Sequence, residues 1–258
     1  MSELSKRVIT ALLLVIVVWA WYFHTSSPWF ERLLALIGLI GTCEIVLLMQ
    51  LRFPFVYMLT SLPLWCAFSL HADVRYFLFM ALAWFALYVL SARQKEASFF
   101  SFVAAIWLLF WLYMFAVALA TTHDQGAAQY LMIGACLAIW SADIAAYFIG
   151  RAWGKRKLCA VISPGKSIEG SLAGLIAGVM VAVGCWLYWQ VLPLLPALMV
   201  ALVVVMAGIL GDLSESAVKR SIGAKDSGKW LPGHGGILDR IDAMMMALPV
   251  SWLIWELL

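Results

Sequence analysis

Apolar residues dominate this chain in long runs that are separated by short polar segments. These runs lie at residues 8–23, 33–51, 53–70, 76–90, 99–120, 130–149, 172–189, 191–210 and 243–258. A helix needs about 20 apolar residues to cross a bilayer, so the shorter runs need tilt or aromatic anchors to do so. The pattern predicts an all-α protein, a polytopic integral membrane helix bundle with about nine transmembrane helices. The third and fourth runs are the least regular, since Pro54 and Pro63 interrupt one and Arg75 crowds the other.

The composition agrees with membrane insertion and excludes a soluble globular fold. Apolar residues make up 65% of the chain and charged residues only 12%, whereas soluble proteins carry about 25% charged residues. Because burying a charge in a membrane is costly, the few charged residues are expected to gather where the function lies.

The basic residues also indicate an orientation. With nine spans and a cytoplasmic N-terminus, all of the 17 Lys and Arg residues except Arg32 and Arg75 fall on the cytoplasmic side. Cytoplasmic segments of membrane proteins are enriched in Lys and Arg, so this count supports the predicted topology.

The two halves of the chain differ in composition. Residues 1–122 are rich in Leu, Trp and Phe, and we expect them to surround the core or to form a dimer interface. Residues 123–258 carry more small residues, with Gly170, Gly174 and Gly178 at every fourth position. This spacing lets two helix backbones approach closely, so the second half is predicted to be a tightly packed transmembrane core.

The first charged loop of that core, residues 151–167, is basic and contains no acid. Such a loop commonly sets the topology or contacts anionic headgroups. Its end reads Ser163-Pro-Gly-Lys166-Ser167, where small and hydroxyl residues precede the seventh span. Exposed amides at the start of a helix favour a phosphate, so a phosphate pocket is the alternative interpretation. The spacing does not match a Walker A loop.

The second charged loop, residues 212–242, balances five acids against five bases among several glycines. Asp212, Glu215, Ser216 and Lys219 fall at i, i+3, i+4 and i+7, which predicts one face of a helix that continues the eighth span. Further along the chain, Asp239 and Asp242 lie three residues apart at the start of the ninth span. A turn that its glycines make conformationally permissive, His234-Gly235-Gly236, precedes them.

Carboxylates at helix ends, without a Cys or His cluster, suit a hard cation such as Mg²⁺. Interleaved bases suit the phosphates that such a cation bridges. A network of structural ion pairs is the alternative. Asp143 lies inside the sixth span and needs a partner or a cation there, although an ion path through a transporter would also explain it. Glu44, inside the second span, is interpreted as a structural polar contact.

One stretch of the second loop resembles a known family. Residues 216–242 read SAVKRSIGAKDSGKWLPGHGGILDRID, which is similar to the signature of the phosphatidate cytidylyltransferases, also called CDP-diacylglycerol synthases. Supporting similarity lies at residues 140–150, 163–170 and 211–213. Ser167 and Ile168 replace a Thr and an aromatic residue that are common in the family. The resemblance is specific over the C-terminal half and only architectural over the first 120 residues.

The resemblance implies transfer of the cytidylyl group of CTP to phosphatidic acid, giving CDP-diacylglycerol and pyrophosphate. It implies a Mg²⁺ site, with or without a second cation, whose expected ligands are Asp212 and Asp239, joined by Asp242 and Asp143. Asp226 is expected to join Asp242 and Asp143 as an additional or supporting ligand of the cation and to belong to the catalytic group. The triphosphate and the leaving pyrophosphate are expected to contact four basic residues: Lys219, Arg220, Lys225 and Arg240. The pocket for the nucleotide and its phosphates is expected to include Ser163, Lys166, Ser167, Ser216, His234, Gly235 and Gly236.

Two other function classes remain open from the sequence. A CTP-dependent polyprenol or dolichol kinase would need similar groups but would release CDP, and an ion-coupled transporter would use the buried carboxylates without CTP. The expected partners are CTP, phosphatidic acid, membrane lipids and a second copy of the chain in a homodimer. No nucleic acid is expected. The expected location is the bacterial inner membrane, with the active site facing the cytoplasm.

Overall fold

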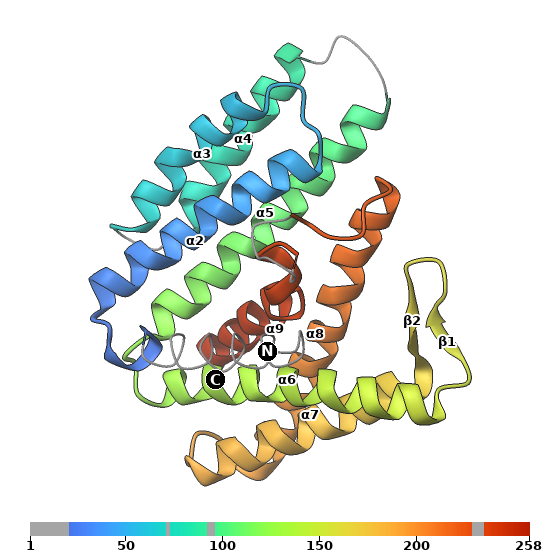
Figure 1. Cartoon of the computed structure of the whole chain (residues 1–258). Coiled ribbons are helices and arrows are strands. Elements are labelled where there is room, and N and C mark those ends of the chain that lie inside the picture. The colour runs from blue at the N-terminus through green and yellow to red at the C-terminus, as the bar shows by residue number, and fades with distance from the viewer. Residues whose placement is uncertain (1–20, 71–72, 92–95, 229–234) are drawn as a thin grey trace, which may run out of the picture.

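The computed structural model describes residues 21–70, 73–91, 96–228 and 235–258, most of which lie in helices (Figure 1). The predicted helical architecture is confirmed for these residues, and most of the first predicted span, residues 8–23, lies outside them. The helices are α2 (Ser27–Leu48), α3 (Pro54–Phe68), α4 (Val74–Ser91), α5 (Glu96–Thr122), α6 (Ala127–Trp153), α7 (Ile168–Tyr188), α8 (Leu194–Ser221) and α9 (Leu238–Leu257).

Four of the described helices are long and apolar enough to cross a membrane. These candidate spans are Phe99–Thr122 within α5, together with the whole of α6, α7 and α8. Two further apolar helices, Pro54–Phe68 and Arg75–Leu90, are shorter. The described part of the chain therefore supports a polytopic membrane protein.

Two helices extend beyond the apolar runs that predicted them. Helix α8 continues from its apolar part through Lys219 to Ser221, and α9 begins at Leu238, ahead of residue 243. Charged residues spaced three or four apart can continue a helix by pairing along its surface. Pro54 occupies the first position of α3, where a proline needs no amide hydrogen bond, and α3 continues past Pro63.

A short β-hairpin lies in the basic loop, which the all-α prediction did not anticipate. Strands β1 (Lys157–Cys159) and β2 (Ser163–Ser167) pair antiparallel. Strands of three and five residues are too short to produce a detectable alternation of polar and apolar positions. The Glu169 carboxylate accepts hydrogen bonds from the amides of Lys155 and Arg156, which fastens the hairpin to the start of α7.

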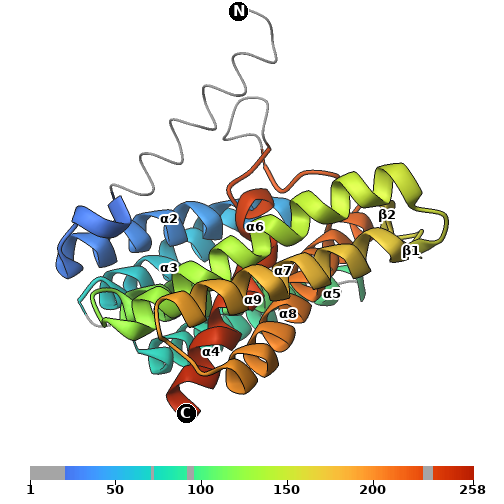
Figure 2. The same ribbon diagram turned by 90° about the horizontal axis from the view of Figure 1, so that it is seen from below.

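Helices α6 and α7 lie side by side, and the glycines of α7 face the backbone of α6 (Figures 1 and 2). A Cβ atom on Gly170 or Gly174 would lie 2.7 Å from a carbonyl oxygen of α6, and one on Gly178 would lie 3.0 Å from another. Such distances leave no room for a side chain. The predicted close approach of two helix backbones is therefore confirmed.

Helix α9 lies in the middle of the molecule, where it contacts α5, α6 and α8 (Figure 1). Helices α2, α3 and α4 pack with α5 on one side of α9, and α6, α7 and α8 lie on the other. The start of α9 thus faces both halves of the chain, and side chains from either half are able to reach it.

Candidate active site

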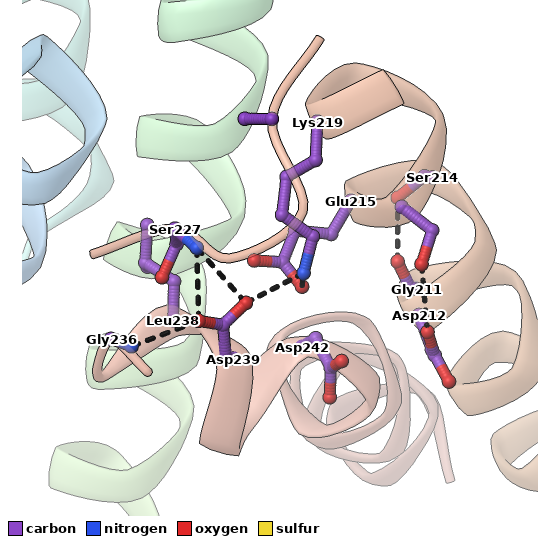
Figure 3. A network of polar contacts seen from close by, with 12 residues as sticks. Gly211, Asp212, Ser214, Glu215, Lys219, Ser227, Gly236, Leu238, Asp239 and Asp242 are labelled. Carbon is purple, nitrogen blue, oxygen red and sulfur yellow. Dashed lines mark hydrogen bonds and ion pairs between the residues drawn. The ribbon is translucent and has the colours of Figure 1, made fainter. Parts of the chain in front are cut away.

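The charged ends of α8 and α9 meet in a buried ion-pair cluster (Figure 3). The Nζ atom of Lys219 lies 3.2 Å from a Glu215 carboxylate oxygen and 2.6 Å from Asp239 Oδ1. Glu215 is fully buried and Lys219 is 7% exposed. A buried ammonium needs compensating charge, and here Glu215 on the same helix and Asp239 on α9 supply it. Lys219 thereby joins α8 to α9.

The Asp239 carboxylate is also held by backbone amides. The Ser227 amide donates to both of its oxygens, at 2.9 and 3.1 Å, and the Gly236 amide donates to Oδ2 at 2.8 Å. Burial opposes the ionisation of Asp239, but the Lys219 ammonium and these amides outweigh it and hold its pKa below the usual range. Gly235 has a φ of 81°, so the permissive turn brings the backbone close to Asp239.

Three further carboxylates lie near one another on separate helices: Asp143 on α6, Asp212 on α8 and Asp242 on α9. Asp212 and Asp143 are both close enough to repel Asp242, and Asp212 also repels Asp143. Asp242 lies ahead of the apolar part of α9, between Asp239 and Asp212 in Figure 3. Burial and the Asp212 charge raise the pKa of Asp242 to about 6.

The basic hairpin reaches the same region through Lys166. Its ammonium pairs with Asp212 Oδ2, and the hydroxyl of Ser216 donates to Asp212 Oδ1 at 3.2 Å. Lys166 is also close enough to attract Asp143. The structure therefore brings together residues from both charged loops and from the sixth helix.

These carboxylates fit a hard cation by the chemistry of their oxygens, but they do not form a complete cage. Among the described residues, no three His, Cys, Asp or Glu side chains are arranged to hold a metal ion by themselves. Mg²⁺ is usually bound by one or two carboxylates together with phosphate oxygens of a substrate. Asp143, Asp212 and Asp242 together offer the one or two carboxylates that this role needs, and a cation beside them would relieve their mutual repulsion.

The two serines of the hairpin lie at opposite ends of β2. Ser167 caps α7, since its hydroxyl accepts a hydrogen bond from the Gly170 amide at 3.1 Å, and it is 5% exposed. Ser163 is partly exposed and pairs with Cys159 in the hairpin. The capping bond explains why a hydroxyl residue is useful at position 167 independently of any ligand.

Several predicted site residues lie at the surface of the molecule. Arg220, Lys225, Asp226 and Arg240 are exposed, and the guanidinium of Arg220 donates to the Ala224 carbonyl at 2.9 Å. The structure does not bring Arg220 into the cluster with Lys219. His234 lies outside the described residues.

Two residues contribute to the site in ways that the sequence did not indicate. Ser227 holds Asp239 through its amide, and nothing in the composition of its loop distinguishes it from other small polar residues. Glu44, from α2, accepts hydrogen bonds from Ile237 N at 2.8 Å, Leu238 N at 3.0 Å and Ser227 Oγ at 3.3 Å. The position of Glu44 inside an apolar run indicated that it has a polar partner, but it did not identify that partner, which lies about 190 residues away in the sequence.

The fold and the cluster define a helical membrane protein with carboxylates and ammonium groups gathered at the ends of its core helices. Residues 5–258 match the model of the cytidylyltransferase family, and the chain belongs to that family. It is similar to the phosphatidate cytidylyltransferase of Haemophilus influenzae, with 31% identity over 278 residues that cover 95% of this chain and 96% of that protein.

Two other relatives are similar over a shorter length. The phosphatidate cytidylyltransferase of Bacillus subtilis is 43% identical over 135 residues, which cover 52% of this chain and 50% of that protein. The phosphatidate cytidylyltransferase of Pseudomonas aeruginosa is 47% identical over 128 residues, which cover 48% of this chain and 47% of that protein.

Proposed function

We propose that this chain is a Mg²⁺-dependent enzyme that transfers the cytidylyl group of CTP to phosphatidic acid, giving CDP-diacylglycerol and pyrophosphate. The observation that carries the proposal is the meeting of the Lys166–Asp212 pair with Asp143 and Asp242 in a member of the cytidylyltransferase family. The names of its relatives support the same reaction.

The reaction needs little acid–base chemistry from the protein. A phosphate monoester has a second pKa near 6, so the lipid phosphate is largely dianionic at neutral pH and attacks without a general base. One of its oxygens bonds to the α-phosphorus of CTP, and the bond from that phosphorus to the bridging oxygen of the β-phosphate breaks. Pyrophosphate leaves with that bonding electron pair. The protein must therefore align and neutralise two polyanions.

The residues divide this work according to their positions. We assign Asp143, Asp212 and Asp242 to the cation, which when bound would supply positive charge that neutralises the phosphates. Lys166 would contact a phosphate beside the start of α7, where the helix dipole also favours negative charge. Surface bases near the loop would attract the triphosphate from solution: Arg220, Lys225 and Arg240.

Lys219 and Asp239 are already paired with each other, so we assign them first to holding α8 and α9 in register. In that role they fix the spacing between Asp212 on one helix and Asp242 on the other. The sequence had placed Asp239 among the metal ligands. To act as a metal ligand, Asp239 would have to give up some of its present hydrogen bonds and bind the cation instead.

The distribution of basic residues supports a bacterial inner-membrane enzyme with nine spans and a cytoplasmic N-terminus. Both charged loops would then face the cytoplasm, where CTP is available. We further propose that residues 1–122 mediate a homodimer, since the described residues of this half expose many large apolar side chains. A second cation beside Mg²⁺ is compatible with the number of carboxylates.

The proposal is tested with purified protein in detergent, CTP, phosphatidic acid and Mg²⁺. The expected products are CDP-lipid and pyrophosphate in equal amounts, and chelation of Mg²⁺ should stop their formation. Release of CDP with a newly phosphorylated lipid alcohol would instead identify a kinase. Ion flux in sealed vesicles without any dependence on CTP would identify a transporter.

A further inference from the structure

Glu44 is a buried acid of the N-terminal half that reaches across to the start of α9. It lies on α2 and is 1% exposed. Its Oε1 accepts a hydrogen bond from Ile237 N at 2.8 Å, and its Oε2 accepts one from Leu238 N at 3.0 Å. Hydrogen bonds to a charged acceptor in a buried setting are among the stronger ones in proteins.

The Glu44 carboxylate caps the N-terminus of α9, because the residues at that end of the helix provide no capping side chain. The cap position of α9 is Ile237, and no side-chain cap hydrogen bond is made there. The first amides of a helix have no partner within the helix, and a negative charge beside them is stabilising. Glu44 thus fixes the position and direction of the first turn of α9, which carries Asp239.

Ser227 connects Glu44 to Asp239. Its hydroxyl donates to Glu44 Oε2 at 3.3 Å, while its amide donates to both oxygens of Asp239. Gly236 closes the arrangement, because a Cβ atom there would lie 2.1 Å from Ser227 Oγ and 2.6 Å from Glu44 Oε2. The backbone that carries the amide donors of Asp239 is therefore held in place by Glu44.

We propose that Glu44 is a positioning residue of the transferase site. It acts through Ser227 and the first turn of α9 to keep Asp239 against Lys219, and so keeps α8 and α9 in register. The inference rests on the proposed function, and it assigns to the first half of the chain a part in the chemistry of the second half. In this role Glu44 acts through other residues and needs no contact with a substrate.

The test compares two variants that break different parts of this contact with one control. Glu44→Gln keeps the shape of the side chain but replaces one carboxylate oxygen with an amide nitrogen, so one backbone donor at the start of α9 loses its acceptor. Ser227→Ala removes only the hydroxyl and keeps the amide that holds Asp239. The control is Thr42→Val on the same helix, which removes a buried hydrogen bond from Trp65 Nε1 (2.9 Å) and leaves α9 untouched.

Two measurements are made on each variant, after its unfolding temperature in detergent has been determined. The first is hydrogen exchange of the backbone at residues 225–240, which reports positioning without any substrate. The second is kcat and KM for CTP and phosphatidic acid. Glu44→Ala is included to show the full effect, but it leaves two amides without partners and is the variant most prone to misfold.

We expect faster exchange at residues 225–240 in Glu44→Gln and Ser227→Ala but not in Thr42→Val. Each of the two should lower kcat by about tenfold, the factor for one lost charged hydrogen bond, with KM within about twofold of wild type. The double variant should lower kcat by less than the product of the two single reductions, because both substitutions break the same hydrogen-bond network.

Unchanged exchange and unchanged kcat in both site variants would overturn the inference. An equal fall of kcat in Thr42→Val would also overturn it, since that result indicates a general loss of stability. If wild-type protein makes no CDP-lipid, the proposed function fails instead, and the exchange measurement still tests whether Glu44 holds this segment.

Discussion

At the scale of single residues, the site is organised around charges that compensate one another in pairs. Lys219 lies between Glu215 and Asp239, and Lys166 pairs with Asp212. The spacing of Asp212, Glu215 and Lys219 on one helix face was readable from the sequence, since helical periodicity fixes it. The partners of Asp239 were not readable, because two of its donors are backbone amides and backbone positions leave no sequence pattern.

Asp212 is the residue whose loss should affect the reaction most. Asp212→Asn should reduce Mg²⁺-dependent formation of CDP-lipid by about 100-fold or more, the factor that a loss of a few kcal/mol of charge stabilisation produces. The variant should still fold, since asparagine keeps the shape and one acceptor. Asp124→Asn, an exposed acid outside the cluster, is the matched control. Near-normal turnover in Asp212→Asn would refute the assignment to the cation.

Lys219 should matter for stability as well as for activity. Lys219→Met leaves the Glu215 and Asp239 carboxylates buried without their ammonium, which should cost about 3–5 kcal/mol of unfolding free energy. Thermal unfolding in detergent measures this loss. A second variant, Lys219→Met with Glu215→Gln, should recover part of it because it removes one of the two stranded charges. No recovery would show that Glu215 is not a significant partner.

At the scale of elements, the sequence predicted the helices well because long apolar runs specify them, but it missed two features. The hairpin of β1 and β2 was missed because its strands are very short and are held by Glu169, which belongs to the next helix. The sequence placed Asp239 and Asp242 at the start of the ninth helix, but it did not indicate that Glu44 of α2 stabilises the first turn of α9. Contacts between distant segments decide both cases.

The contact between α6 and α7 gives a direct prediction about packing. Gly174→Ala would place a Cβ atom 2.7 Å from the Ala142 carbonyl oxygen, so it should destabilise the protein by about 1–3 kcal/mol through overpacking. Gly184→Ala on the same helix meets nothing within 4 Å and should be neutral or slightly stabilising. Thermal unfolding of the two variants in one detergent compares them. Equal stability would contradict the close backbone approach.

At the scale of the whole molecule, the sequence predicted a polytopic membrane protein whose charges gather in its second half. It treated the first half as a surround, whereas the structure brings Glu44 of that half to the start of α9. This link was hidden because a single acid in an apolar run does not identify its partner. Composition describes each half by itself, and only the folded chain relates them.

The orientation of the molecule is testable through a native cysteine. Cys159 lies in the hairpin, and among the described residues it is a free thiol. If the hairpin faces the cytoplasm, a membrane-impermeant thiol reagent should label it in inverted vesicles and not in intact spheroplasts. Cys159→Ser should remove that labelling and serves as the control. Labelling in intact spheroplasts would place the charged loops on the outer side.

The proposed attack of a lipid phosphate on the α-phosphorus of CTP can be followed with a phosphorus label. Purified protein is given phosphatidic acid, Mg²⁺ and CTP labelled at either the α- or the γ-phosphate, and the lipid is then extracted. We expect the α-label to enter the lipid and the γ-label to stay in water as pyrophosphate. Transfer of the γ-label into the lipid would refute this mechanism.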